Sequence, residues 1–242
     1  MASCSNCKTE SSGDFCSCCG NPLIIHRIDK SYLTQELLKL IGYERGFLYT
    51  AKELFLRPGK VIREYIQEDR QKITKPITYL ILTSLIYTFI SHYFKTDVIQ
   101  NEMIKSIYGD SLTYQLFYWV QNNYGYANLL LLVPITLWTK FLFSDYKYNL
   151  YETFVVMSLV MAQGMLLYTL HVVLNFTFPT VALLNEFIMG FIMLVYLTWS
   201  IGQFYEGTRL SYFKALLSYV LGMVTFQVVI VVVGVILSLL LK

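Results

Sequence analysis

The sequence predicts an all-α membrane protein built on a five-span transmembrane helix bundle. Of the 242 residues, 55% are hydrophobic and only 14% are charged, whereas a soluble domain has about 25% charged residues. The stretch 76–94 contains no Asp, Glu, Lys or Arg. As a helix it would rise roughly 28 Å, about the thickness of the hydrocarbon core of a bilayer. Further apolar runs follow it, and a bilayer can bury this much apolar surface where a soluble core cannot.

The apolar runs predict five spans of helical length. Their expected limits are about residues 76–94, 127–143, 151–176, 186–205 and 213–241. Pro134 falls inside the second span, where neighbouring helices can satisfy the carbonyl group that proline frees. A short helix around residues 116–119 is expected at the far interface, because aromatic side chains gather there. Glycines in the last three spans indicate close helix approach; they are Gly164, Gly190, Gly202, Gly222 and Gly234.

The first 25 residues are polar and contain two Cys-x2-Cys pairs. The members of these pairs are Cys4, Cys7, Cys16 and Cys19. Two such pairs present four thiolates, the ligand set of a tetrahedral structural Zn²⁺ site. The segment has almost no apolar residues for a core, so metal binding must supply most of its folding free energy. We therefore predict a small N-terminal zinc ribbon over residues 1–25, with Cys18 as a spare.

Other interpretations of the cysteines remain open. The thiols could pair as disulfides or stay idle, although a cytosolic location disfavours disulfides. His26 is an alternative ligand. A catalytic zinc is disfavoured, because four thiolates leave no open coordination position.

Residues 26–75 have the pattern of amphipathic lead-in helices. One helix is expected after Ser31, a second after Gly46, and a third after a break at Arg57-Pro58-Gly59. Basic side chains accompany the apolar faces, which is typical of helices lying in the membrane interface near lipid phosphates. Arg57, Lys60, Arg63 and Arg70 are expected to meet such phosphates, or Glu152 and Glu206. The alternative is a soluble helical hairpin that packs only on itself. The resulting domains are 1–25, 26–75 and 76–242.

The run from residue 44 to residue 87, which includes the segment PGKVIREYI, resembles a bacterial family of uncharacterised multi-pass membrane proteins. The motifs Lys147-Tyr148-Asn149-x2-Glu152 and Gly202-Gln203-Phe204-Tyr205-Glu206 are similar to short motifs of that family. Its members have an N-terminal zinc ribbon. This chain departs from them in the short spacing between its cysteine pairs and in its fifth cysteine. The family carries a "domain of unknown function" label, so the resemblance implies architecture and no activity. The five-span plan also distantly resembles the Yip1 class.

The distribution of basic residues predicts the orientation. Fifteen of the 19 Lys and Arg lie in the N-terminal segment and in the two loops expected on its side, and three lie in the opposite segments. Cytoplasmic flanks accumulate Lys and Arg. We therefore expect a multi-pass protein of the bacterial inner (cytoplasmic) membrane, with a cytoplasmic N-terminus and the C-terminus outside.

A polar site within or beside the spans is a further expectation. Its candidate residues are Glu152, Gln163, His171, Gln227 and Arg209. Polar groups in a bilayer usually face the bundle, and a solute or ion path would need several of them together. The alternative is hydrogen bonding between helices, at about 0.6 kcal/mol each. Glu152, Arg209 and Glu206 could form a polar cluster on the cytoplasmic side, or they could equally be solvated ends of the spans.

No catalytic constellation is visible, and no Gly-rich phosphate loop is present, so we do not expect an enzyme. The favoured function is that of a scaffold, sensor or membrane organiser whose zinc ribbon docks a cytosolic protein. The alternative is a small channel, transporter or membrane-permeabilising effector. A membrane enzyme for lipid or polyprenyl substrates is a third hypothesis. The expected partners are the lipid bilayer and a cytosolic protein, with no nucleic acid; a homo-oligomer stays open.

Overall fold

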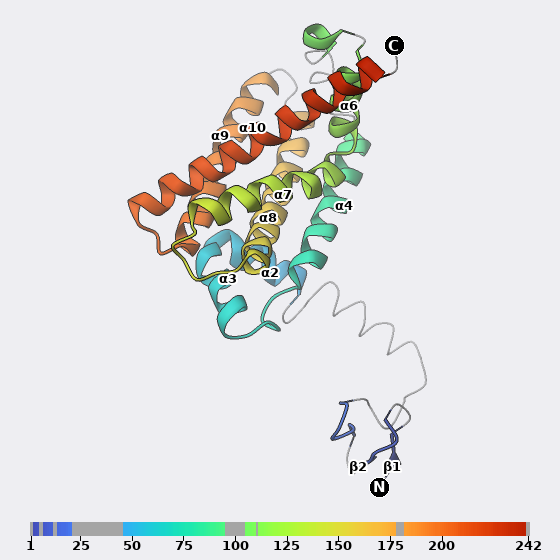
Figure 1. Ribbon diagram of the computed structural model, residues 1–242, viewed down its shortest axis with the longest axis vertical. Coiled ribbons are helices and arrows are strands. Elements are labelled where there is room, and N and C mark those ends of the chain that lie inside the picture. The colour runs from blue at the N-terminus through green and yellow to red at the C-terminus, as the bar shows by residue number, and fades with distance from the viewer. Residues whose placement is uncertain are drawn as a thin grey trace. The chain divides into compact units, whose positions relative to one another are not determined.

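The computed structural model describes residues 2–4, 7–11, 14–20, 46–94, 105–109, 111–177 and 182–240. The chain divides into two compact units, Met1–Tyr43 and Glu44–Lys242. The elements of each unit are labelled in Figure 1. The helix expected after Ser31 and the alternative ligand His26 lie outside the described residues.

The first unit contains a small antiparallel pair of strands, β1 (Ala2–Ser3) and β2 (Glu10–Ser11). Ala2 pairs with Ser11 and Ser3 with Glu10. A ladder this short has little stability in water by itself. Its effect is to hold the chain on either side of the first cysteine pair close together.

The second unit contains five helices that are long and apolar enough to cross a membrane. They are α4 (Pro76–Phe94), α7 (Tyr124–Leu142), α8 (Leu150–Thr177), α9 (Ala182–Phe204) and α10 (Arg209–Leu240). This confirms the prediction of five candidate spans. α4 has the limits expected from the sequence, and the other four agree with their predicted limits to within a few residues.

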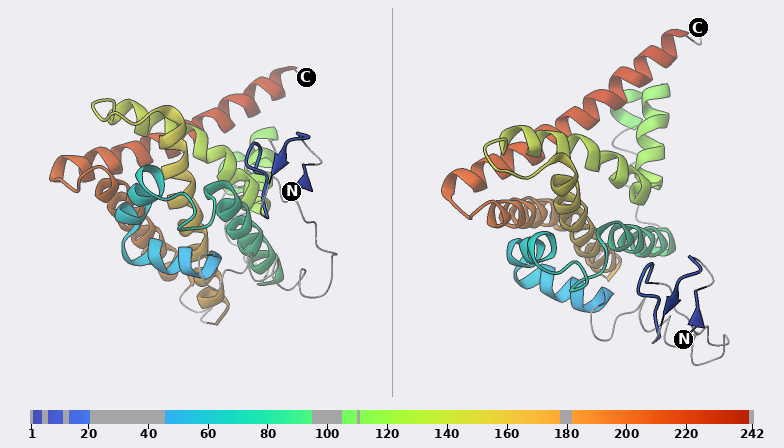
Figure 2. Two further views of the ribbon diagram at one scale, coloured as in Figure 1. Left: turned by 90° about the horizontal axis from the view of Figure 1, so that it is seen from below. Right: turned by 60° about the horizontal axis from the view of Figure 1, so that its bottom comes forward.

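Helix α8 is the centre of the bundle. Figure 2 shows it surrounded by α4, α7 and α9. Two-thirds of its most apolar 18-residue window is buried, against 17% for α10. A span that exposes so much apolar surface has lipid as its natural solvent, so α10 lies at the outside of the bundle and α8 at its core.

Glycines allow some helices of the bundle to touch. A Cβ added to Gly222 of α10 would lie 2.5 Å from the Ile135 side chain of α7, and one on Gly234 would lie 2.5 Å from Thr113. Thr113 belongs to α6 (Leu112–Asn122), the predicted short helix between the first two spans, which is longer than expected. Gly190 was wrongly expected to indicate close approach. It is exposed, and an added Cβ would meet nothing within 4 Å.

The lead-in helices are α2 (Phe47–Leu56) and α3 (Pro58–Gln67). In Figure 1 they are blue and cyan, at the end of the bundle where α4 begins. Both contact α8, and α3 also contacts α9. The break that the sequence predicts is confined to Arg57, because Pro58 suits the first turn of a helix, where its missing N–H is not needed. The alternative of a hairpin that packs only on itself is wrong.

Candidate functional site

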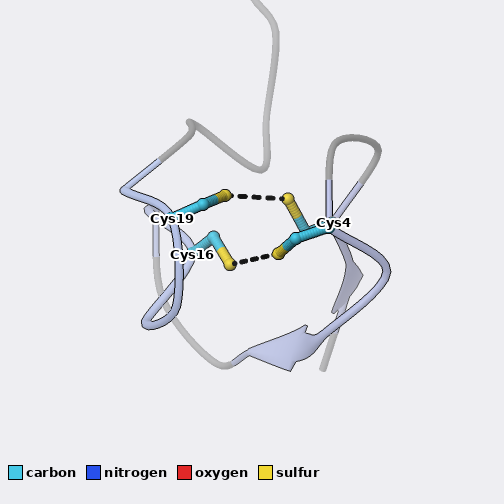
Figure 3. Close-up of side chains that lie close together, drawn as sticks. Cys4, Cys16 and Cys19 are labelled. Atoms are coloured by element: carbon cyan, nitrogen blue, oxygen red, sulfur yellow. Dashed lines mark hydrogen bonds between the residues drawn. The ribbon is translucent and has the colours of Figure 1, made fainter.

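The four cysteines of the two Cys-x2-Cys pairs lie together. Their sulfur atoms are all within 4.8 Å of one another. Sγ of Cys4 is 3.5 Å from Sγ of Cys19, and Sγ of Cys7 is 3.5 Å from Sγ of Cys16 (Figure 3). A tetrahedral Zn²⁺ with Zn–S bonds of about 2.3 Å places its sulfur ligands roughly 3.8 Å apart. The group therefore has the size of a four-thiolate metal site.

The two pairs also share one backbone geometry. The amide of Lys8 donates to the carbonyl oxygen of Cys4 over 3.0 Å, and that of Gly20 donates to Cys16 over 2.9 Å. Lys8 and Gly20 each follow the second cysteine of a pair, and each is left-handed, with φ of 62° and 70°. Glycine adopts this conformation freely, whereas lysine does so at a cost of about 1–2 kcal/mol. The repeated turn aims two thiols from each pair at a common point.

The chemistry of Cys7 suits a metal ligand. Hydrogen bonds with the side chain and the backbone of Thr9 lower the pKa of the Cys7 thiol from 9.0 to about 6. The thiolate is the form that binds metal. Cys18 is exposed and lies outside the group of four. These four thiols could hold a metal ion, and they would leave no coordination position for a substrate.

Among the predicted polar residues, Gln163 is buried where α2, α4 and α8 meet. Its Nε2 donates to the carbonyl oxygen of Ala51 in α2 over 3.1 Å, and its Oε1 accepts from the hydroxyl of Tyr79 in α4. Nearby, the hydroxyl of Tyr196 in α9 donates to the carbonyl oxygen of Leu54 over 3.0 Å. Both side chains thus hold α2 against the bundle. The arrangement is the one expected of hydrogen bonding between helices.

His171 is buried in the part of α8 that precedes its C-terminal end. Its Nε2 lies 3.1 Å from Oε1 of Glu186 in α9 and 3.0 Å from Nδ2 of Asn175. Nδ2 of Asn175 also donates to Glu186 over 3.1 Å. This cluster joins α8 to α9. The contact between Glu186 and His171 was not predicted from the sequence.

The remaining candidate polar residues of the described chain, Gln227, Arg209 and Glu152, form no hydrogen bond or ion pair with Gln163 or His171. Gln227 and Arg209 are exposed on α10. Glu152 accepts from the amide of Asn149 over 2.8 Å, and the amide of Glu152 donates to the Asn149 side chain, so the two cap the N-terminus of α8. In the described part of the chain, no ion pair joins Glu152, Arg209 and Glu206. The cluster of these three, which the sequence left open, is therefore not formed.

A contact that the sequence did not indicate fixes α3 to the end of α9. Nη1 of Arg63 donates to the carbonyl oxygens of Gln203 and Phe204 over 2.5 and 2.9 Å. The amide of Gly59 donates to Oε1 of Gln203 over 2.7 Å. The last carbonyls of a helix lack partners within it and favour a cation. The α3–α9 contact, formed by Gly59, Arg63, Gln203 and Phe204, satisfies them.

Three basic residues of the lead-in have partners within the protein that the sequence did not indicate. Arg63 donates to backbone carbonyls of α9 and to no carboxylate among the described residues. Arg57 pairs with Glu53 of its own α2, and Lys60 lies 3.8 Å from Glu64 in α3. Within the residues that the structure describes, none of these three forms an ion pair or a hydrogen bond with Glu152 or Glu206. Arg57 and Lys60 have a carboxylate one turn away, and Arg63 is held by the carbonyls of α9.

A family profile described as "Protein of unknown function (DUF3667)" matches residues 44–88. The match supports the predicted relationship to an uncharacterised family. It covers α2, α3 and the first part of α4, and therefore includes Gly59, Arg63 and Tyr79. It includes neither the cysteine segment nor the four later spans. No curated protein and no solved structure matches the chain.

Proposed function

We propose that this protein is a non-enzymatic adaptor of the bacterial cytoplasmic membrane. In this proposal a zinc-bound head at the N-terminus docks a cytosolic protein, and the lead-in helices connect that event to the spans. The five apolar helices and the four clustered thiols support the two halves of the proposal. The proposal assigns no reaction to the protein.

Zinc is the metal that fits the head best. Four thiolates in two Cys-x2-Cys pairs form the usual closed ligand set of structural zinc. Cys4, Cys7, Cys16 and Cys19 would hold the ion, which would supply the folding free energy that a segment without an apolar core lacks. The ion would thereby shape the loops that a partner contacts.

The α3–α9 contact is the observation that carries the adaptor proposal. The segment entering α4 is fixed to α9 through Gly59 and Arg63, and to α8 through Gln163. A displacement of α2 or α3 must therefore disturb part-buried hydrogen bonds to two spans. The lead-in could therefore transmit a structural change from the head to the bundle when a partner binds. Such coupling requires that the α3–α9 contact have two alternative arrangements.

The orientation belongs to the same proposal. Basic residues are concentrated on the N-terminal side of the first span, which favours a cytoplasmic N-terminus. A head in the reducing cytosol keeps its thiols available for metal. With five spans the C-terminus would lie outside the cytoplasm.

The experiment is an affinity purification of the full-length protein from its native membranes. Wild type and Cys18→Ser should retain the same cytosolic protein, because Cys18 lies outside the thiol group. Cys16→Ser should lose it, because the head loses a ligand. The same protein recovered in equal amount with Cys16→Ser would contradict docking through the metal-bound head.

The cluster of buried His171 with the partly exposed Asn175 and Glu186 favours a second candidate, a small ion or solute pathway. Buried ionisable groups within spans usually serve such paths or hold helices together. Two small cavities of about 10 Å³ each lie elsewhere among the spans, one near Asn128 and one near His92. Flux through liposomes containing the purified protein, compared with His171→Phe, tests this candidate.

A further inference from the structure

A cavity of about 270 Å³ lies where the C-terminal end of α3 meets the N-terminus of α8. It is lined by Tyr65, Ile66, Arg70, Asn149, Tyr151, Glu152 and Val155. It opens at the beginning of a candidate span, which is the level at which lipid headgroups lie.

The cavity contains one positive and one negative side chain that do not pair with each other. Arg70 comes from the turn after α3, and Glu152 comes from the first turn of α8. No ion pair or hydrogen bond holds Arg70 among the described residues, whereas Arg57, Arg63 and Lys72 are each held by protein groups. Glu152 uses Oε2 for the Asn149 amide, which leaves Oε1 for another donor.

The other walls combine apolar and aromatic surface. Ile66 and Val155 are apolar, and the rings of Tyr65 and Tyr151 stand beside them. Tyrosine is enriched at the boundary between lipid and water, because its ring is apolar and its hydroxyl is polar. A ligand with one positive group, one negative group and an adjoining apolar part would be complementary to the charged, aromatic and apolar side chains that line this cavity.

We propose that the cavity binds the headgroup of a zwitterionic phospholipid that carries a primary ammonium, such as phosphatidylethanolamine. The phosphate contacts the guanidinium of Arg70, whose fork of donors suits phosphate oxygens. The ammonium donates to Glu152. Ile66 and Val155 contact the glycerol and the first carbons of the acyl chains. The site is independent of the proposed metal and of the proposed protein partner.

The charges predict a preference among lipids. Phosphatidylglycerol offers a phosphate to Arg70 but leaves Glu152 without a cation. Phosphatidylcholine offers a quaternary ammonium that cannot donate a hydrogen bond. Both should bind more weakly than phosphatidylethanolamine, because each makes one charge-assisted hydrogen bond fewer with Arg70 and Glu152.

The test is native mass spectrometry of the full-length protein in mild detergent with each of the three lipids. Wild type should retain phosphatidylethanolamine about tenfold more tightly than the other two. Arg70→Gln should lose that adduct. Glu152→Gln should shift the preference towards phosphatidylglycerol, and glutamine at this position still caps α8. Arg209→Gln, an exposed arginine on α10, is the matched control and should behave as wild type.

Unfolding temperatures measured without added lipid establish that the variants are folded. Equal retention of all three lipids by the wild type would overturn the proposal. Unchanged retention of phosphatidylethanolamine by a folded Arg70→Gln would overturn it as well. A loss of the adduct in Arg209→Gln equal to that in Arg70→Gln would show bulk attraction to the membrane surface and would also count against the site.

Discussion

Gly59 and Gln203 are in direct contact although 144 residues separate them in sequence. The amide of Gly59 donates to Oε1 of Gln203 over 2.7 Å, and a Cβ on Gly59 would lie 2.5 Å from the carbonyl carbon of Gln203. Only a residue without a side chain permits this approach. The contact therefore explains why glycine follows proline at the start of α3.

The first prediction concerns this approach. Gly59→Ala should destabilise the protein by about 1–3 kcal/mol, because the added methyl group meets backbone that cannot move aside. Thermal unfolding in detergent measures the change. Gly190→Ala is the control: it lies inside α9 with open space around it, and alanine favours a helix. Equal unfolding temperatures for Gly59→Ala and wild type would contradict the close approach.

The second prediction concerns the guanidinium of Arg63. Arg63→Lys should weaken the α3–α9 contact by about 1–3 kcal/mol, because an ammonium group does not reproduce the planar fork of arginine. Arg70→Lys, which removes no hydrogen bond within the described protein, should leave the unfolding temperature unchanged. Double-mutant analysis with Gly59→Ala should give non-additive losses, because both residues act at Gln203. Additive losses would place the two residues in separate contacts.

The third prediction concerns metal. Purified protein should contain about one zinc per chain by elemental analysis; Cys18→Ser should keep it and Cys16→Ser should lose it. The pKa of Cys7 is lowered to about 6, so its thiolate is present above that pH and is lost as the pH falls through it. Metal retention during dialysis should therefore be high at pH 7 and should decline as the pH is lowered, because protons compete with the metal for the thiolates. Retention by Cys16→Ser would be inconsistent with the assigned ligands.

The fourth prediction concerns the ion pair between Glu64 and Lys72. The ammonium of Lys72, 2.6 Å from Oε2 of Glu64, lowers the pKa of Glu64 below 4.5 and raises that of Lys72. A carboxyl group whose pKa is lower in the folded state than in the unfolded state stabilises the folded protein at pH values above its unfolded-state pKa. This stabilisation is lost as the pH falls through the folded-state pKa. Glu64→Gln should thus be less stable than wild type at pH 7, and the two should converge below pH 4.5. A difference that persists at low pH would exclude ionisation as its cause.

The spans could be predicted because bilayer thickness and side-chain hydropathy determine their length, and α4 agrees with its predicted limits residue for residue. The ends of the spanning helices, where polar residues begin, were harder to predict. α10 begins at Arg209, four residues before the expected start, because Thr208 caps it through the amide of Ser211. α9 begins before Glu186, which hydropathy places at an end but which contacts Asn175 of α8.

The four thiols could be found from sequence because their spacing is local. The α3–α9 contact could not, since nothing in the periodicity of α3 indicates that Arg63 meets carbonyls of a distant helix. In the same way, the apolar pattern of α2 does not distinguish Leu54 from its neighbour Phe55. Leu54 is fully buried and Phe55 is 53% exposed, because the neighbouring spans cover a narrower face than the pattern marks.

The most direct test of the account is the protease accessibility of the lead-in, residues 46–75, in inverted vesicles of the cytoplasmic membrane. The account predicts slow cleavage in wild type, because α2 and α3 are held by Gln163 and by the α3–α9 contact. Gly59→Leu, whose side chain cannot fit against Gln203, should be cleaved quickly while its spans remain inserted. Cleavage of wild type as fast as that of Gly59→Leu would contradict the account, because the lead-in would then be a free linker.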